Sequence, residues 1–163
     1  MTNILARFAG KLCEVLLPIK HDIFFGNEKS SVAVCTLSSI DLLEQISKSY
    51  LMSSIVLVAR LFSENKGIEK LIEYVLEHPN IKHIILCGKD TKGHIPGQAL
   101  LALYKNGIDG KGRIIGALGK DPVIEDLTKS NIDEFRRRIN IIDLVGITDI
   151  NEVSIRVASL AKA

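Results

Sequence analysis

Apolar runs of strand length alternate with amphipathic segments along most of the chain. Strands are expected over residues 31–37, 54–62, 81–88, 112–117 and 140–146, and helices over residues 39–50, 65–79, 97–107, 130–139 and 149–163. The strand candidates are apolar at consecutive positions, which is typical of strands buried on both faces. Their alternation with helices predicts a doubly wound, Rossmann-like α/β domain with a mainly parallel sheet.

The start of the chain has a different pattern. Its apolar residues recur at helical spacing and share one face: Ile4, Leu5, Phe8, Leu12, Val15 and Leu16. Arg7 and Lys11 interrupt this run, unlike the apolar part of a signal peptide, and Pro18 ends it. We expect residues 1–29 to form an N-terminal helix and connector, and residues 30–163 the α/β core of a single domain. The helix is expected to cover that core, the alternative being a membrane surface or a partner protein.

Composition excludes several classes of protein. The 163 residues are 47% hydrophobic and 25% charged, and the net charge of +2 is too small to indicate a nucleic-acid partner. No apolar run is long enough to span a membrane. Cys13, Cys35 and Cys87 are odd in number and lack zinc-site spacing, so we expect a reducing compartment and core packing for the last two.

The common motifs of α/β enzymes are missing from the sequence. It has no GxGxxG after the first strand, no Walker sequence and no GxSxG. Dinucleotide binding, nucleoside triphosphate binding and α/β-hydrolase activity are therefore disfavoured. The adjacent acids Glu125/Asp126 and Asp133/Glu134 lie in polar segments and are expected to be solvated. The run Arg136–Arg138 is likewise expected on the exposed face of a helix.

His94 differs from the other three histidines because it follows a strand, in the loop where this fold binds ligands. Gly93 and Gly97 flank it and allow close approach of a bulky group, and the helix start beyond them could receive an anion. The residues expected to line the same edge are Thr36, Leu37, Ser38, Glu64, Asn65, Gly67, Gln98, Gly116, Ala117, Leu118 and Gly119.

Residues 80–119 contain "CG", then "KGHIPGQ", then "NGID" and "GRIIGA". This block resembles the corrinoid-binding A subunit of tetrahydromethanopterin S-methyltransferase from methanogenic archaea. The resemblance implies a cobamide, either cobalamin or 5-hydroxybenzimidazolyl cobamide, with His94 as axial ligand to cobalt. It further implies a methyl carrier between methyl-tetrahydromethanopterin and coenzyme M. Such a chain is one component of a membrane complex with other subunits, and not a complete enzyme.

The sequence departs from related patterns at several points. Other corrinoid proteins have DxHxxG, and here Lys92 stands at the aspartate position. The second imidazole nitrogen should therefore meet a backbone carbonyl, a hydroxyl, a water or a carboxylate from another loop. Residues 58–65, "VARLFSEN", also depart from the family's pattern, which bears on the ligand contacts of that loop.

The family commonly carries a C-terminal membrane anchor, which this sequence does not contain. A cytoplasmic location follows as an expectation, with membrane association through partner subunits or a missing anchor. The alternative function is a non-catalytic regulatory module of the same fold that binds a cobamide or a phosphate-bearing ligand.

Overall fold

The computed structural model describes residues 22–161. In chain order its elements are β1 (Ile23–Phe25), β2 (Val32–Cys35), α2 (Ile40–Ser47), the 3₁₀ helix η1 (Tyr50–Ser53), β3 (Leu57–Ala59), α3 (Lys66–Glu77), β4 (His83–Gly88), α4 (Pro96–Asn106), α5 (Lys129–Arg138), β5 (Asn140–Val145) and α6 (Ile150–Ala161). The helix expected over residues 1–18 lies outside the described residues.

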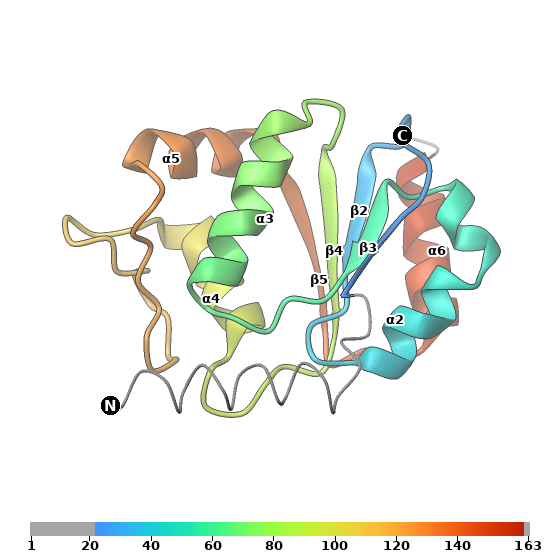
Figure 1. The fold of residues 1–163 in the computed structure, drawn as a ribbon, viewed down its shortest axis with the longest axis horizontal. Coiled ribbons are helices and arrows are strands. Elements are labelled where there is room, and N and C mark those ends of the chain that lie inside the picture. Colours follow the sequence, from blue (N-terminus) through green and yellow to red (C-terminus); the bar gives the residue numbers. More distant parts are fainter. Residues whose placement is uncertain (1–21, 162–163) are drawn as a thin grey trace, which may run out of the picture.

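The strands form one five-stranded sheet in the order β1-β3-β2-β4-β5. The pairs β2–β3, β2–β4 and β4–β5 are parallel, and only β1 runs antiparallel to its neighbour β3. Figure 1 shows α2 and α6 on one face of the sheet and α3, α4 and α5 on the other. This arrangement confirms the predicted Rossmann-like α/β class.

Strand β4 explains why the sequence is apolar at consecutive positions. Ile84 and Leu86 pack into the core beneath α3, α4 and α5, whereas Ile85 and Cys87 pack into the core beneath α2 and α6. Successive side chains point to opposite faces, and both faces are covered. Cys35 and Cys87 are free thiols within these cores, as expected, and burial raises the pKa of each to about 12.

The prediction of a strand over residues 112–117 is wrong. This region forms only the isolated bridges Ile108–Ile114 and Arg113–Val123 among the described residues. Gly112 and Gly116 have φ of +79° and +85°, outside the extended region, so the chain turns at both ends of the short apolar run. The fifth strand of the sheet is β1, which lies in the span predicted to be a connector.

The strand order reverses at β2, because the next strand along the chain, β3, pairs with one side of β2 and β4 pairs with the other. The loops after β2 and β4 therefore meet at the carboxyl edge of the sheet. The backbone N–H of Ser38 donates to the carbonyl of Lys89 over 3.0 Å, and the N–H of Lys89 donates to Oγ of Ser39 over 2.9 Å. This edge, with its joined loops, is where ligands of such folds bind.

Candidate functional site

His94 and Glu64 form the central pair of the site. His94 lies in the loop between β4 and α4, and Glu64 in the loop between β3 and α3. The imidazole Nδ1 is 2.8 Å from Glu64 Oε1. The His94 side chain is 54% exposed, whereas that of Glu64 is 1% exposed. The partner of the imidazole is thus a carboxylate from another loop, one of the groups expected from the sequence.

Glu64 also binds the segment that follows α4. The same oxygen, Oε1, accepts a hydrogen bond of 2.6 Å from the backbone N–H of Asp121. The other oxygen, Oε2, is buried and has no hydrogen-bond partner among residues 22–161. It lies against Gly119, where a Cβ atom would be 1.3 Å from it. Glu64 therefore connects the histidine loop to the 119–121 segment through a single carboxylate.

The start of α4 is not open to an anion, contrary to the sequence-based expectation. Asp90 Oδ1 accepts from the N–H of Gly97 over 3.0 Å, and Oδ2 accepts from the N–H of Gln98 over 2.9 Å. A carboxylate at these unpaired N–H groups also interacts favourably with the helix dipole. Asp90 was missed in the sequence because it lies five residues before the capping position Ile95, outside local capping patterns.

Gln98 fastens the other side of the same segment. Its Nε2 donates to the carbonyl of Gly116 and its Oε1 accepts from the N–H of Leu118, both over 2.9 Å. Both ends of the amide are therefore used within the protein. The Leu118 side chain is 76% exposed beside this clamp, and Gly116 has a positive φ of 85°. Gln98 shapes the site by holding residues 116–118.

The other predicted residues of the β2 and β4 loops differ in how much of each residue reaches the edge. Thr36 and Leu37 are fully buried and bring only backbone groups to the edge. Ser38 is half-buried and donates from Oγ to the carbonyl of Lys89 over 2.6 Å. Gly93 has φ of +85°, and among the described residues a Cβ there would approach only the side chain of Lys120, whereas a Cβ at Gly97 would lie 2.9 Å from Leu37. Gly93 is thus open, and Gly97 is required by packing.

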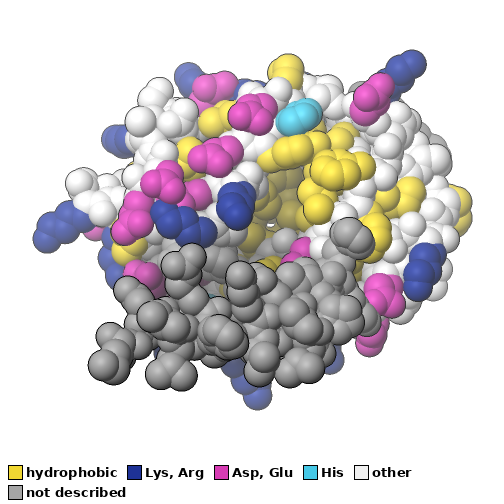
Figure 2. All heavy atoms as spheres, in the orientation of Figure 1, with side chains coloured by type: hydrophobic (Ala, Val, Ile, Leu, Met, Phe, Trp, Pro, Cys, Tyr) yellow, Lys and Arg dark blue, Asp and Glu magenta, His cyan; other side chains and the backbone are white. Residues whose placement is uncertain are grey.

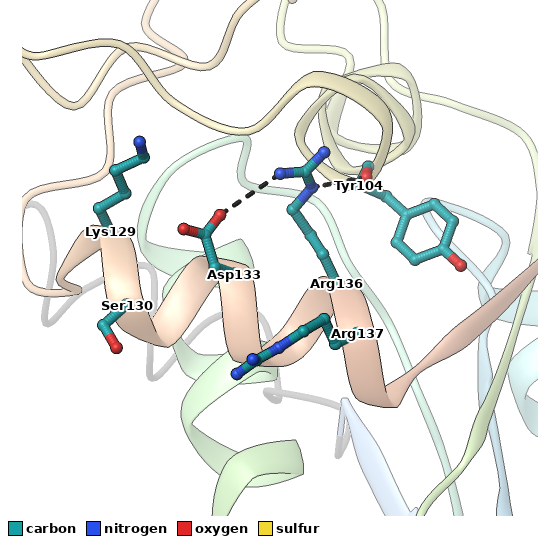
Figure 3. Close-up of a pocket in the computed structure, with 6 residues that line it drawn as sticks. All are labelled: Tyr104, Lys129, Ser130, Asp133, Arg136 and Arg137. Atoms are coloured by element: carbon teal, nitrogen blue, oxygen red, sulfur yellow. Dashed lines mark hydrogen bonds and ion pairs between the residues drawn. The ribbon is translucent and has the colours of Figure 1, made fainter.

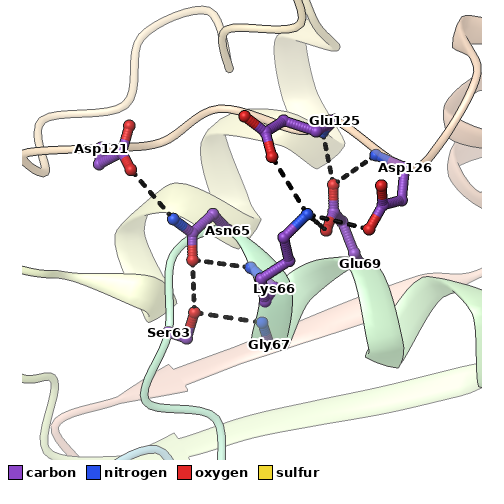
Figure 4. Close-up of polar contacts among 8 residues, drawn as sticks. All are labelled: Ser63, Asn65, Lys66, Gly67, Glu69, Asp121, Glu125 and Asp126. Carbon is purple, nitrogen blue, oxygen red and sulfur yellow. Dashed lines mark hydrogen bonds and ion pairs between the residues drawn. The ribbon is translucent and has the colours of Figure 1, made fainter. Parts of the chain in front are cut away.

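Asn65 and Gly67 serve the start of α3. Asn65 Oδ1 accepts from the N–H of Lys66 over 2.7 Å, which caps the helix, and Asn65 Nδ2 donates to Asp121 Oδ2 over 3.2 Å. The N–H of Gly67 donates to Oγ of Ser63 over 3.2 Å. Figure 4 shows these contacts. They hold the loop between β3 and α3, which carries Glu64.

Lys66 and Glu69 attach residues 125 and 126 to α3 (Figure 4). Lys66 Nζ lies 2.9 Å from Asp126, 3.0 Å from Glu69 and 3.2 Å from Glu125. Hydrogen bonds to Asp126 and Glu69, then to Glu125, raise the pKa of Lys66. Glu125 and Asp126 have exposed side chains, as predicted, and their ion pairs with Lys66 were missed because the partners are far apart in sequence.

Glu69 is a buried carboxylate that accepts backbone hydrogen bonds from Glu125 and Asp126. Burial alone would raise its pKa. The N–H groups of Asp126 and Glu125, together with Lys66, outweigh burial and hold the pKa of Glu69 below its ordinary value. The ionised form of Glu69 is thus the one that fastens this segment.

A basic cleft of about 860 Å³ lies on α5 and the C-terminal part of α4 (Figure 3). Arg136 donates to the carbonyls of Tyr104 and Lys105 at the end of α4, each over 2.8 Å. Arg138 donates to the carbonyls of Val75 and Leu76 near the end of α3. The expectation that Arg136–Arg138 is a solvated face is therefore wrong for the first and third arginines and holds only for the exposed Arg137.

Two kinds of feature are absent from the part of the chain that the structure describes. Residues 22–161 contain no group of three or more His, Cys, Asp or Glu side chains placed to hold a metal ion. Among the same residues, no helix is both long and apolar enough to cross a membrane.

The fold and the edge define a Rossmann-like α/β domain whose exposed His94 is held by the buried carboxylate of Glu64. The chain belongs to the MtrA family, described as the A subunit of tetrahydromethanopterin S-methyltransferase, whose model matches residues 14–163. Curated relatives agree with this membership and place the chain with the components of a methyltransferase.

Within the aligned regions, three relatives are 36–38% identical to this chain. Tetrahydromethanopterin S-methyltransferase A subunit 2 of Methanothermobacter thermautotrophicus is 36% identical over 140 residues, covering 85% of this chain and 74% of the relative. The A subunit of Methanocaldococcus jannaschii is 38% identical over 137 residues, covering 83% and 55%. A Methanosarcina barkeri protein, provisionally named the A subunit of a methyltransferase Mtx, is 36% identical over 143 residues, covering 88% and 68%. The chain thus spans between about half and three quarters of these relatives.

Proposed function

We propose that this chain binds a cobamide at the edge around His94 and carries a methyl group as one component of a methyltransferase. The observation that carries the proposal is the pairing of the exposed His94 with the buried Glu64. With Nδ1 engaged by the carboxylate, Nε2 is the nitrogen that can coordinate cobalt. A corrin ring supplies its own equatorial nitrogens, so a single protein nitrogen suffices as axial ligand.

Glu64 supports this role chemically. A carboxylate that accepts from Nδ1–H fixes the imidazole tautomer, leaves Nε2 unprotonated and increases its basicity as a metal ligand. Glu64 is itself held by the N–H of Asp121 and by close packing against Gly119. It thereby takes the place of the aspartate that Lys92 replaces in the DxHxxG pattern.

The surrounding backbone fits a large, flat ligand. Gly93 is open toward solvent, and residues 116–119 are held beside the histidine loop by Gln98 and Glu64. We assign cofactor contacts to these loops and to Ser38, with Thr36 and Leu37 contributing backbone only. Because Asp90 occupies the start of α4, the alternative of a phosphate-bearing ligand at that helix is disfavoured.

A bound cobamide would supply a cobalt centre that accepts a methyl group as a nucleophile and yields it to a thiolate. The residues of this chain orient the axial nitrogen, retain the ligand and present it to partners. The family's name gives tetrahydromethanopterin as the methyl-transfer substrate. The sequence resemblance further implies methyl-tetrahydromethanopterin as the methyl donor and coenzyme M as the acceptor. Other subunits on the cytoplasmic side of a membrane complex would perform those two transfers.

Electron paramagnetic resonance of the Co(II) form tests the ligand directly. The purified chain is mixed with a cobamide whose own base cannot coordinate, and the cobalt signal should show splitting by one nitrogen. His94→Ala should remove that splitting, whereas His78→Ala, a matched control at the end of α3, should retain it. Persistence of the splitting in His94→Ala would exclude His94 as the ligand.

Binding and carriage are separated by a second measurement. Co-elution and a shifted visible spectrum report cobamide binding, and methyl exchange with the partner subunits reports carriage. Absence of both binding signals in the unmodified chain would overturn the proposed function. Binding without exchange would leave a non-catalytic cobamide module.

A further inference from the structure

A second hollow lies between α3 and the β1/β3 side of the sheet, next to the loop that carries Glu64. It has a volume of about 570 Å³. Its floor consists of small side chains on neighbouring strands, Ala33 and Cys35 on β2 and Ala59 on β3, and Cys35 lies beside Ala59 in the register. Figure 2 shows hydrophobic side chains gathered around a depression on this face of the molecule. Ile84 on β4, which is opposite Ala33 in the register, also lines the hollow.

Several polar groups at its rim already have partners within the domain, although Arg60 Nε is buried without one among residues 22–161. Arg60 pairs with Asp22 over 3.0 Å, and Ser63 Oγ donates to Asn65 Oδ1 over 2.7 Å. Lys66 is bound by three carboxylates. Ligand pockets usually present a few convergent polar groups for orientation. The remaining lining is mainly apolar and therefore suits apolar side chains better than a polar small molecule; it includes Leu57, Leu61, Leu71, Val75, Ile81 and Ile84.

The chain itself provides such side chains next to the opening. Asp22 and Ile23, the first described residues, line the hollow. Directly before them the sequence repeats apolar residues at helical spacing, including Phe8, Leu12 and Leu16. A segment tethered at the rim of an apolar hollow has a high effective concentration there.

We propose that the apolar side chains of residues 4–16 occupy this hollow, so that the N-terminal segment completes the core beside α3. The segment then covers the β1/β3 side of the sheet. The proposal does not require cobamide binding. Ala33, Cys35 and Ala59 on the floor are not assigned to the His94 edge, although Gly67, which was expected at that edge, also lines the hollow.

The absence of tryptophan from the sequence permits a single-reporter test in the full chain. In Phe8→Trp, tryptophan emission should be blue-shifted, and acrylamide quenching should be several-fold weaker than for N-acetyltryptophanamide. Adding Ala59→Leu, which fills the floor, should shift the emission to the red and strengthen quenching. Adding Leu118→Ala, on the exposed loop, should change neither value.

Each other outcome contradicts the proposal. Emission like that of the free reporter would show that the segment is not docked. Blue-shifted emission that Ala59→Leu leaves unchanged would place the segment elsewhere. Emission that depends on protein concentration would assign the hollow to a second copy of the chain.

A thiol measurement covers the case in which Ala59→Leu fails to fold. In a Cys13→Ser background, Leu12→Asp with Leu16→Asp should accelerate labelling of Cys35 several-fold, because Cys35 lies on the floor of the hollow. Labelling of Cys87, packed in the core under α2 and α6, should not change. Lys11→Asp is the control on the polar face, and equal Cys35 rates in all three proteins would overturn the proposal.

Discussion

Gly119 lies directly against the buried carboxylate of Glu64, leaving no room for a side chain. A Cβ at position 119 would be 1.3 Å from Oε2 and 2.4 Å from Cδ. The glycine thus determines where Glu64 sits, and through Glu64 it determines how His94 is held. This steric relationship leads to a prediction that does not require any ligand.

Gly119→Ala should displace Glu64 and weaken its bond to His94. We expect the free energy of unfolding to fall by about 1–3 kcal/mol, the usual cost of overpacking a filled site. Urea denaturation measures the loss, and nitrogen NMR of the imidazole reports a changed tautomer balance. Gly110→Ala is the control, because nothing lies within 4 Å of a Cβ there, and it should change stability by no more than about 0.5 kcal/mol. Equal effects of the two substitutions would contradict the packing role.

Glu64→Gln tests the carboxylate separately from its shape. The amide keeps an acceptor for Asp121 but loses the charge that favours a proton on Nδ1 of His94. The Nδ1–H tautomer should decrease in the nitrogen spectrum, and stability should fall by about 1–3 kcal/mol. Glu28→Gln, on the exposed surface, should leave both unchanged. An unaltered imidazole spectrum in Glu64→Gln would mean that the carboxylate does not set the tautomer.

Asp90→Ala should destabilise the protein by about 1–2 kcal/mol, because two N–H groups at the start of α4 lose their acceptor. Asp90→Asn keeps one acceptor oxygen, so its loss of stability should be smaller than that of Asp90→Ala. The measurement is the denaturant midpoint, with amide exchange at Gly97 and Gln98 as a local readout. Unchanged exchange at these two amides in Asp90→Ala would refute the capping role.

Arg136→Ala should also cost about 1–3 kcal/mol, since it removes charged hydrogen bonds to two carbonyls at the end of α4. Arg137→Ala provides a neighbouring control, because that side chain is exposed, and its effect should stay within about 0.5 kcal/mol. Thermal or urea unfolding compares the two. Equal losses of stability in Arg136→Ala and Arg137→Ala would support the sequence-based expectation that Arg136–Arg138 is a solvated face.

Glu69 predicts a pH dependence of stability. Its pKa in the folded protein is lowered, so the unfolded chain binds more protons as pH falls past the ordinary glutamate pKa of about 4.3. The stabilisation by Glu69 is therefore complete above that pH and decreases as pH falls through the lower, folded pKa. Urea midpoints at a series of pH values should show the difference between wild type and Glu69→Gln narrowing in acid. Parallel pH profiles would contradict this linkage.

The sequence was sufficient to predict the α/β class, because consecutive apolar residues such as Ile84 and Ile85 require burial on both faces of a sheet. It was also sufficient to place His94 at the carboxyl edge. The apolar run around Ile114 predicts a strand, and the positive φ of the flanking Gly112 and Gly116, which the pattern does not reveal, makes the chain turn instead. The three-residue strand β1 was too short to give a pattern.

Partners distant in sequence could not be predicted from periodicity. Glu64 was expected at the edge, but its bond to His94 depends on how two loops 30 residues apart meet. Asp90 caps α4 from beyond the range of local motifs, and Arg136 reaches carbonyls about 30 positions away. Such contacts follow from tertiary packing, which one sequence without its fold does not reveal.

The segment after α4 is held by Gln98 at residues 116–118, by Glu64 at residue 121 and by Glu69 at residues 125 and 126. The turn before these anchors, at Asp109–Lys111, is exposed and is closed by its own hydrogen bonds, from Lys111 and Arg113 to the Asp109 carboxylate. We therefore expect that changes in the length of this turn do not alter the position of His94. Gly110 is accordingly the position at which an epitope or a fluorescent label can be inserted while the geometry of the histidine edge is preserved.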